Sequence, residues 1–165
     1  MKLHNDNLIF SPSDLILFLE SPFASWMEHF GLISPEALDL KDQDDAMMLM
    51  LQDKGAEHES SVLEGLKQQG LTIANIGLSS DKKAATIQAM KEGADVVFQA
   101  CLSQDQFTGF ADFLVRVPGS SQLGDYHYEI WDTKLSKSLQ PYYTIQLCCY
   151  QEMIAAIQGR YSNDF

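Results

Sequence analysis

Two acidic residues interrupt segments of the sequence that are otherwise typical of buried β-strands. Asp112 lies in the apolar run FTGFADFLVRV (107–117), and Asp132 lies in YEIWDTKL (128–135), with Lys134 two residues later. Because side chains alternate along a strand, Asp132 and Lys134 are expected on the same side of theirs. A carboxylate in such a strand is costly unless it is paired, hydrogen-bonded or bound to a cation. If the two segments pair as a hairpin, the sequence predicts two acids side by side with one lysine.

Such a pair of acids could bind a metal ion. Adjacent carboxylates repel and raise each other's pKa unless a divalent cation neutralises them. Oxygen ligands suit Mg²⁺ or Mn²⁺, and a neighbouring ammonium can orient water or stabilise charge that develops on a phosphate. A simpler interpretation also fits the spacing: Asp132 and Lys134 form a half-exposed ion pair and Asp112 caps a bulge, since charged pairs are common on strands.

Two further candidates lie in segments with helical periodicity. His58 belongs to GAEHE (55–59), and the steps of three and four place it in line with Leu51 and Val62. Gln146 and Tyr150 are four residues apart and therefore share one helical face. Each has an ordinary alternative, a surface or packed histidine in the first case and the polar edge of a packed helix in the second.

The elements that must position these residues follow from periodicity and from helix-stop residues. Ser13 is expected to cap the first helix, and Pro22 to open a second that ends at Gly31. The turn PGSSQLG (118–124) predicts that the last two strands form a hairpin. Helices are predicted near 13–20, 22–30, 45–69, 81–92 and 141–158, and strands near 95–102, 107–117 and 126–135. Helices around a group of strands indicate an α/β (α+β) fold.

Length and composition bound the class of protein. A chain of 165 residues with 45% hydrophobic residues predicts one globular domain, divided into a helical N-terminal arm over 1–44 and a core over 45–159. The net charge of −12 argues against a simple duplex-binding protein, whose surface is normally basic. The charge is uneven, because residues 36–64 hold nine acids and two bases while 116–160 hold four of each.

The cysteines and the apolar runs of the sequence bear on its compartment and on membrane association. The three cysteines (Cys101, Cys148 and Cys149) are too few and badly spaced for a disulfide framework. The start MKLHNDNLIF lacks a basic region followed by a long apolar stretch, and no apolar run approaches the roughly 18 residues that a membrane span needs. We therefore expect a soluble, cytoplasmic protein with no membrane partner.

Taken in order, the candidate residues resemble a known family. The motifs GxxHE (55–59), GxxD (109–112), DxK (132–134) and QxxxY (146–150) are similar to those of RecB-like exonucleases of the PD-(D/E)XK superfamily. The surrounding segments SPSDLILFLESP, GADVVFQA and IQLCCY resemble a RecB-family nuclease domain as well, so that the resemblance covers about residues 8–159. It implies a restriction-endonuclease-like core, with a central mixed β-sheet flanked by helices.

The resemblance also implies an activity. This would be Mg²⁺- or Mn²⁺-dependent hydrolysis of DNA phosphodiester bonds by an activated water, as an exonuclease rather than an endonuclease, in DNA repair or processing. Lys134 would position the water and offset charge on the phosphate. The remaining implied roles are metal ligation (His58, Asp112, Asp132 and the backbone carbonyl of Thr133), shaping of the site's edge (Gln146 and Tyr150) and support (Glu59 and Glu129).

Two departures from the family pattern qualify these expectations. Several relatives hold an iron–sulfur cluster through four cysteines, but Ser21 stands where they often have the first and the downstream set is missing, so no cluster is predicted. The second departure is that the sequence stops a few residues after the last predicted helix, at YSNDF, so the chain could be an excised domain or a stand-alone protein.

The acidic charge predicts weak, salt-sensitive DNA binding, with another domain or partner protein supplying affinity. The alternatives to a nuclease are a catalytically silent PD-(D/E)XK module that binds nucleic acid or serves as a scaffold, and an unrelated α+β interaction domain.

Overall fold

The computed structural model describes residues 1–165 apart from 35, 38–45, 137 and 163–165. The end of the predicted N-terminal arm and the predicted start of the third helix, at 38–45, therefore lie outside the described residues. The helices are α1 (Pro12–Glu20), α2 (Pro22–Ile33), α3 (Ala46–Gln68), α4 (Lys82–Glu92) and α5 (Pro141–Gln158), with a 3-10 helix η2 (Ile76–Leu78). The strands are β1 (Lys2–His4), β2 (Asn7–Ile9), β3 (Ile73–Asn75), β4 (Val96–Gln104), β5 (Phe107–Ser121) and β6 (Gly124–Trp131).

The centre of the fold is a four-stranded mixed sheet with the strand order β3-β4-β5-β6. Strand β3 runs parallel to β4, and the remaining neighbours are antiparallel. The predicted hairpin between the last two strands is confirmed, because Leu114 pairs with Ile130 and Val115 with Glu129. The strands β1 and β2 form a separate hairpin whose turn residues have positive φ, and the sequence analysis did not predict it.

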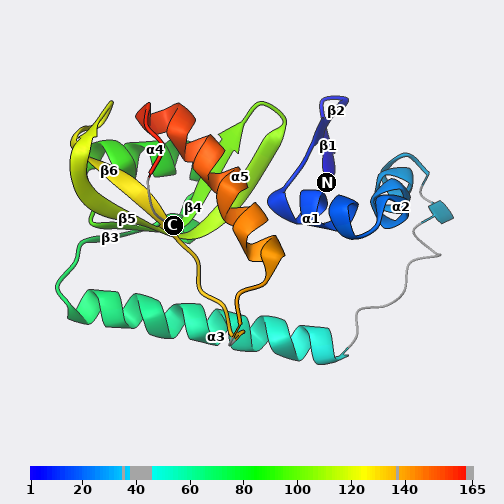
Figure 1. The fold of residues 1–165 in the computed structure, drawn as a ribbon, viewed down its shortest axis with the longest axis horizontal. Coiled ribbons are helices and arrows are strands. Elements are labelled where there is room, and N and C mark those ends of the chain that lie inside the picture. Colours follow the sequence, from blue (N-terminus) through cyan, green and yellow to red (C-terminus); the bar gives the residue numbers. More distant parts are fainter. Residues whose placement is uncertain (35, 38–45, 137, 163–165) are drawn as a thin grey trace.

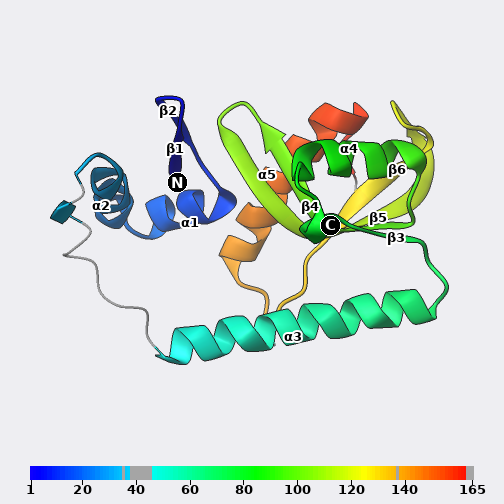
Figure 2. The ribbon, with the colours of Figure 1, turned by 180° about the vertical axis from the view of Figure 1, so that it is seen from behind.

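Helices flank this sheet. In Figure 1 α5 lies on the near side of the sheet and α4 on the far side, and the order is reversed in Figure 2. Helix α3 runs along one border of the molecule, and α1 and α2 lie beyond α5. The fold is therefore a mixed α+β arrangement with a central mixed sheet flanked by helices, as the sequence predicts. Among the described residues, no helix has the length and apolar character needed to cross a membrane.

Two clusters of buried apolar side chains hold the helices on the sheet. The larger joins Met90 of α4 and Ile154 of α5 to strand residues that include Leu114, and all three are fully buried. The smaller joins Leu63, in the C-terminal half of α3, to Phe113 of β5. The half of α3 that packs on the sheet is therefore the C-terminal half, which begins near the GAEHE motif. This packing fixes the position of that motif relative to the sheet.

Two helix boundaries differ from the prediction. Helix α1 is capped by Ser11 and not by Ser13, because Pro12 needs no N–H partner at the first helical position and the backbone N–H of Ser11 donates to the Asp14 carboxylate at 2.7 Å. Helix α2 passes through Gly31 and ends at Ile33. A single glycine costs a helix only about 1 kcal/mol, and the Ser34 N–H still bonds to the carbonyl of Phe30 at 2.9 Å.

Two strand boundaries differ as well. The predicted turn at 118–124 is shorter in the structure, because β5 continues to Ser121 and a register shift between Pro118 and Ser121 accommodates the proline. Strand β6 ends at Trp131, so Asp132 and Lys134 lie just beyond it. Strand alternation therefore does not place these two side chains together, and their proximity has another cause.

Candidate active site

Asp112 connects strand β5 to the segment that follows β6. Its Oδ2 accepts a hydrogen bond from the backbone N–H of Thr133 at 3.0 Å and faces the Thr133 hydroxyl at 3.4 Å. These contacts fold the chain back over the end of the hairpin. Asp112 therefore holds the segment 132–134 against β5. This hydrogen bonding, and not the alternation of side chains along a strand, explains where Asp132 and Lys134 lie.

Asp132 and Lys134 form a close ion pair, with 2.8 Å between Lys134 Nζ and Asp132 Oδ2. The Asp132 side chain is 3% exposed and that of Lys134 is 32% exposed. The ion pair of the simpler interpretation is therefore present, with Lys134 partly exposed and the Asp132 side chain buried. Its second oxygen, Oδ1, is buried with no hydrogen-bond partner in the structure. Lys134 also lies over the ring of Tyr143, with 5.6 Å between Nζ and the ring centroid.

The two aspartates act on each other electrostatically. The pKa of Asp112 is raised to about 7, mainly by burial and also by the side chain and charge of the neighbouring Asp132, while the Thr133 N–H opposes the shift. One lysine faces the two acids. The structure thus brings Asp112, Asp132 and Lys134 together, with two acids beside one lysine and the charged form of Asp112 disfavoured.

Helix α3 contributes Glu59 to the same neighbourhood. Glu59 Oε2 accepts a hydrogen bond from Gln99 Nε2 of β4 at 2.7 Å. Burial raises the pKa of Glu59 and so does the charge of Asp132, whereas Gln99 and Lys134 lower it. Glu59, predicted only in a supporting role, is therefore a third carboxylate within electrostatic range of the aspartate pair.

The structure gives His58 a different setting. It lies on α3 beside Glu59 and is partly exposed. Among the described residues, no three His, Cys, Asp or Glu side chains form a group spaced to hold a metal ion. The ligand set implied by the resemblance, His58 with Asp112 and Asp132, is thus not assembled as a compact group here.

Gln146 and Tyr150 of α5 face strand β5 together. The Tyr150 hydroxyl donates to the backbone carbonyl of Phe110 at 2.7 Å and receives a hydrogen bond from Gln146 Nε2 at 3.3 Å. The pKa of Tyr150 is raised to about 12, mainly by burial and also by the charges of Asp132 and Asp112, while the hydrogen bond from Gln146 opposes the shift. The QxxxY motif therefore lies at the border of the acidic group, anchored to the strand that carries Asp112.

Gly109 explains the first position of the GxxD motif. A Cβ atom at this position would lie 2.7 Å from Cε1 of Tyr150 and 3.0 Å from Cδ of Pro12. Any side chain here would push α5 or α1 away from β5. The glycine thus permits the close approach on which the hydrogen bond between Tyr150 and Phe110 depends.

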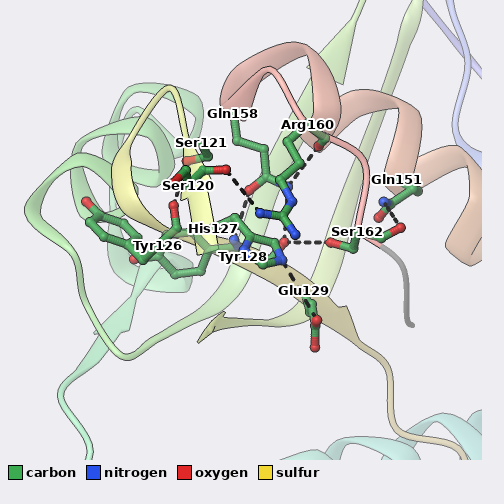
Figure 3. Close-up of polar contacts among 10 residues, drawn as sticks. All are labelled: Ser120, Ser121, Tyr126, His127, Tyr128, Glu129, Gln151, Gln158, Arg160 and Ser162. Atoms are coloured by element: carbon green, nitrogen blue, oxygen red, sulfur yellow. Dashed lines mark hydrogen bonds and ion pairs between the residues drawn. The ribbon is translucent and has the colours of Figure 1, made fainter. Parts of the chain in front are cut away.

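Glu129 belongs to a different polar cluster, drawn in Figure 3, which contains neither aspartate. Its Oε1 lies 3.9 Å from Nε2 of the buried His127. In the same cluster the side-chain amide of Gln158 bonds to both the N–H and the carbonyl of Tyr128, at 2.8 and 3.2 Å. The structure therefore groups Glu129 with His127 on β6, and its predicted supporting role remains a prediction.

Gln99 is a site residue that the sequence analysis did not identify. It interrupts the apolar strand VVFQACL, and its backbone has a φ of 55°. A polar residue in the middle of a buried strand was the available signal, the same one that singled out Asp112. It was left unassigned because its partner, Glu59, is 40 residues away in the sequence.

The site was also compared with known proteins. No protein-family model, no curated protein and no solved structure matches this chain.

Proposed function

We propose that this protein is a Mg²⁺- or Mn²⁺-dependent nuclease that hydrolyses phosphodiester bonds of DNA. The observation that carries the proposal is the buried carboxylate pair, in which Asp132 has an oxygen without a partner and Asp112 has a pKa of about 7. Lys134 lies 2.8 Å from Asp132 and completes a DxK arrangement. The mixed sheet with flanking helices is compatible with a PD-(D/E)XK core, and that finer fold assignment is part of the proposal.

The two aspartates supply oxygen ligands of the kind that a divalent cation prefers, and among the described residues no third acidic, histidine or cysteine side chain is assembled beside them. Two neighbouring carboxylates with too few hydrogen-bond donors are stabilised by a doubly charged ion, because the ion offsets their repulsion. The unpaired oxygen of Asp132 would be one of its ligands. Asp112 and Asp132 would hold the ion, with the backbone carbonyl of Thr133 and His58 as the further ligands that the family motifs suggest. A cation of this kind, when bound, supplies Lewis-acid stabilisation of phosphate charge and lowers the pKa of a bound water.

The protein's own residues have separate tasks in this reaction. Lys134 keeps a positive charge beside the acids, where it can hold the attacking water and stabilise charge on the phosphate. Asp112 fixes the 132–134 segment through the Thr133 N–H. Tyr150 is buried and bonded to the Phe110 carbonyl, so it shapes the edge of the site, and the amide of the partly exposed Gln146 can contact the sugar–phosphate backbone.

The charge of the chain limits how the substrate is held. With 23 acidic and 11 basic residues, the domain alone has few positive groups with which to displace the counterions of DNA, and weak, salt-sensitive binding is expected. We therefore include in the proposal a further domain or partner protein that supplies affinity, and exonuclease action in DNA repair or processing in the cytoplasm.

The deciding experiment incubates end-labelled single- and double-stranded DNA with the protein and Mn²⁺ or Mg²⁺, and with EDTA as the blank. Cleavage is expected only with the metal. Lys134→Ala should reduce the rate by about a hundredfold or more, because the group that stabilises phosphate charge is lost. Lys67→Ala is the matched control, since Lys67 is exposed on α3 and pairs with Glu64.

The outcomes separate the candidate functions. Cleavage that Lys134→Ala leaves unchanged would place the activity elsewhere and overturn the assigned site. Binding of DNA with no cleavage under any metal would favour the catalytically silent module. A wild-type protein that binds neither Mn²⁺ nor DNA would favour the unrelated interaction domain.

A further inference from the structure

Helix α2 is rich in large apolar side chains that the fold leaves at the surface. Every residue of α2 is described, and none of them is buried. Phe23 is 71% exposed and Trp26 is 54% exposed. At the end of α1, Phe18 and Leu19 are exposed as well. A group of exposed apolar side chains of this size is typical of a surface that contacts another molecule.

The N-terminal half of α3 has the same character. Residues 46–62 of this helix are all described and none is buried, whereas Leu63 and Leu66 beyond them pack on the sheet. Four successive apolar side chains of this half are each about half exposed, namely Met48, Leu49, Met50 and Leu51. Because successive helical residues point about 100° apart, these side chains surround the helix. A helix that is apolar on all sides is normally buried against other structure.

These segments lie on one side of the molecule. In Figures 1 and 2, α3 extends beyond the sheet toward the side on which α1 and α2 lie. We call residues 18–33 and 46–51 together the apolar end. It is separate from the candidate active site, whose Asp112 is on β5 and whose Asp132 and Lys134 follow β6. The apolar end is therefore a surface that the proposed reaction does not use.

The aromatic side chains of α2 are stacked on one another. The ring centroids of Trp26 and Phe30 are 5.2 Å apart with 6° between the ring planes, and those of Phe23 and Trp26 are 6.2 Å apart with 26°. Stacking restricts these side chains before a partner binds, which lowers the entropy lost on binding. Aromatic side chains also contribute much of the energy of protein interfaces. Trp26, in the middle of the stack, is the expected anchor of a contact.

The charge around the apolar end determines the kind of partner. Residues 12–57 hold ten acids and two bases, and so account for most of the net charge of −12. Asp53 and Glu57 are exposed directly after the apolar run of α3, and Glu20 is exposed at the end of α1. A second copy of the chain, an anionic membrane and a nucleic acid all carry the same sign of charge, which disfavours contact. A basic partner has the complementary sign.

We propose that the apolar end binds a basic amphipathic helix of a partner protein. Trp26 and Met50 contact the apolar face of that helix, and Asp53 and Glu57 face its lysines and arginines. Methionine side chains are flexible and polarizable, and surfaces that accept amphipathic helices use them often. The inference stands on the exposure of these segments, on the stacked rings and on the sign of the charge. It goes beyond the nuclease proposal and does not require it.

The test mixes the full chain with a synthetic helix of leucine and lysine that has one apolar and one basic face. Backbone amide chemical shifts, measured by NMR, locate the contact. The changes are expected in α2 and in the N-terminal half of α3, and binding should weaken as salt is added because the charges are exposed. The same helix with glutamate in place of lysine should bind at least about tenfold more weakly, because like charges then meet.

Variants at exposed positions separate the apolar contact from the charge. Trp26→Ser and Met50→Ser should each weaken binding of the basic helix about tenfold, the loss typical of a truncated central interface residue. Leu78→Ser is the matched control, since Leu78 is an apolar residue of η2 that is 89% exposed. Asp53→Lys should weaken binding and reduce its salt dependence, whereas Asp125→Lys, at an exposed acid of β6, should not. Circular dichroism of each variant establishes that it is folded.

The other occupants of the apolar end give different results. Self-association of the free protein that Trp26→Ser abolishes would identify a second copy as the occupant and overturn the proposal. Vesicles of anionic lipid, or single-stranded DNA, that shift the amides of the same segments would overturn it too. So would a basic helix that does not bind, or one that shifts only amides of the sheet. Because none of these measurements uses cleavage or a metal, failure here is distinct from failure of the nuclease proposal.

Discussion

Asp95 and Asp112 are two carboxylates near the same sheet, and they differ in the groups that surround and stabilise their negative charge. Asp95 accepts hydrogen bonds from the N–H and the hydroxyl of Thr72, at 2.9 and 2.6 Å, and pairs with the Arg116 guanidinium. The hydrogen bonds from Thr72 and the charge of Arg116 lower the pKa of Asp95. Asp112 is buried beside another acid, and its pKa is raised to about 7.

The difference separates a structural carboxylate from a candidate functional one. At Asp95 the protein supplies enough donors, and the contact joins the start of β4 to Thr72 and to β5. In the pair of Asp112 and Asp132, one oxygen of Asp132 has no hydrogen-bond donor. The single lysine, Lys134, contacts Asp132 and leaves the repulsion between the two carboxylates only partly offset. A carboxylate whose charged form is disfavoured by its own fold is typical of active sites. Three experiments test whether the two aspartates differ in this way.

The largest expected effect is on catalysis. Asp132→Asn should lower the rate of metal-dependent DNA cleavage on the order of a thousandfold, about 4 kcal/mol of activation free energy, because the metal loses a charged ligand. Asp95→Asn should leave the rate within about threefold, since Asp95 is outside the acidic group. Single-turnover cleavage of labelled DNA in excess protein measures both. Equal losses in the two variants would mean that Asp132 acts only through folding.

A smaller effect is expected on stability. Mn²⁺ at about a hundred times its dissociation constant should stabilise the wild-type protein by about 2.7 kcal/mol, visible as a higher melting temperature that EDTA reverses. Asp95→Asn should keep this increase and Asp112→Asn should lose most of it. Thermal melts with and without Mn²⁺ give the comparison directly, and an increase of equal size in Asp112→Asn would contradict the assigned site.

The smallest effect is on pH dependence in EDTA, and it has opposite signs at the two residues. The folded pKa of Asp112, about 7, is above the unfolded value of about 4, so the folded state keeps a proton that the unfolded state loses. Stability therefore falls as pH rises from about 4 to 7. Asp112→Asn should remove this fall and gain about 2 kcal/mol over the wild type at pH 8.

Asp95 provides the opposing case in the same experiment. Its folded pKa is lowered, so its stabilisation is present above the unfolded value of about 4 and is lost as pH falls below it. Asp95→Asn should lose about 1 kcal/mol at neutral pH, the contribution of a typical hydrogen bond. Urea unfolding of both variants from about pH 2 to pH 8 distinguishes them, because this range includes the loss at Asp95 below about pH 4, and parallel profiles would remove the contrast between the two carboxylates.

Local patterns in the sequence identified most of the elements, because their signals lie within a few residues. The 3.6-residue periodicity of α3 and the apolar runs of β4 and β5 are of this kind. The turn before Gly124 was overextended, because Pro118 and Gly119 are turn residues by type but occupy an irregular part of β5. The β1–β2 hairpin was missed since its strands have only three residues each.

The candidate site shows a similar division. Asp112, Asp132 and Lys134 were found because charged residues stand out in apolar segments. The reason for their proximity was not found, because it depends on the hydrogen bond from the Thr133 N–H to Asp112, 21 residues away in the sequence. The contact between Gln99 and Glu59 spans 40 residues, and no local period encodes a pair at that separation.

Strand β6 is an outer strand of the sheet, and its free edge would be open to pairing with another polypeptide. At Tyr128 the amide of Gln158 bonds to both the N–H and the carbonyl of the main chain, and the hydroxyl of Ser162 reaches the same carbonyl at 3.1 Å. A side chain there takes the place of a neighbouring strand's peptide group. The end of α5 and the residues after it thus protect this point of the sheet against edge-to-edge aggregation.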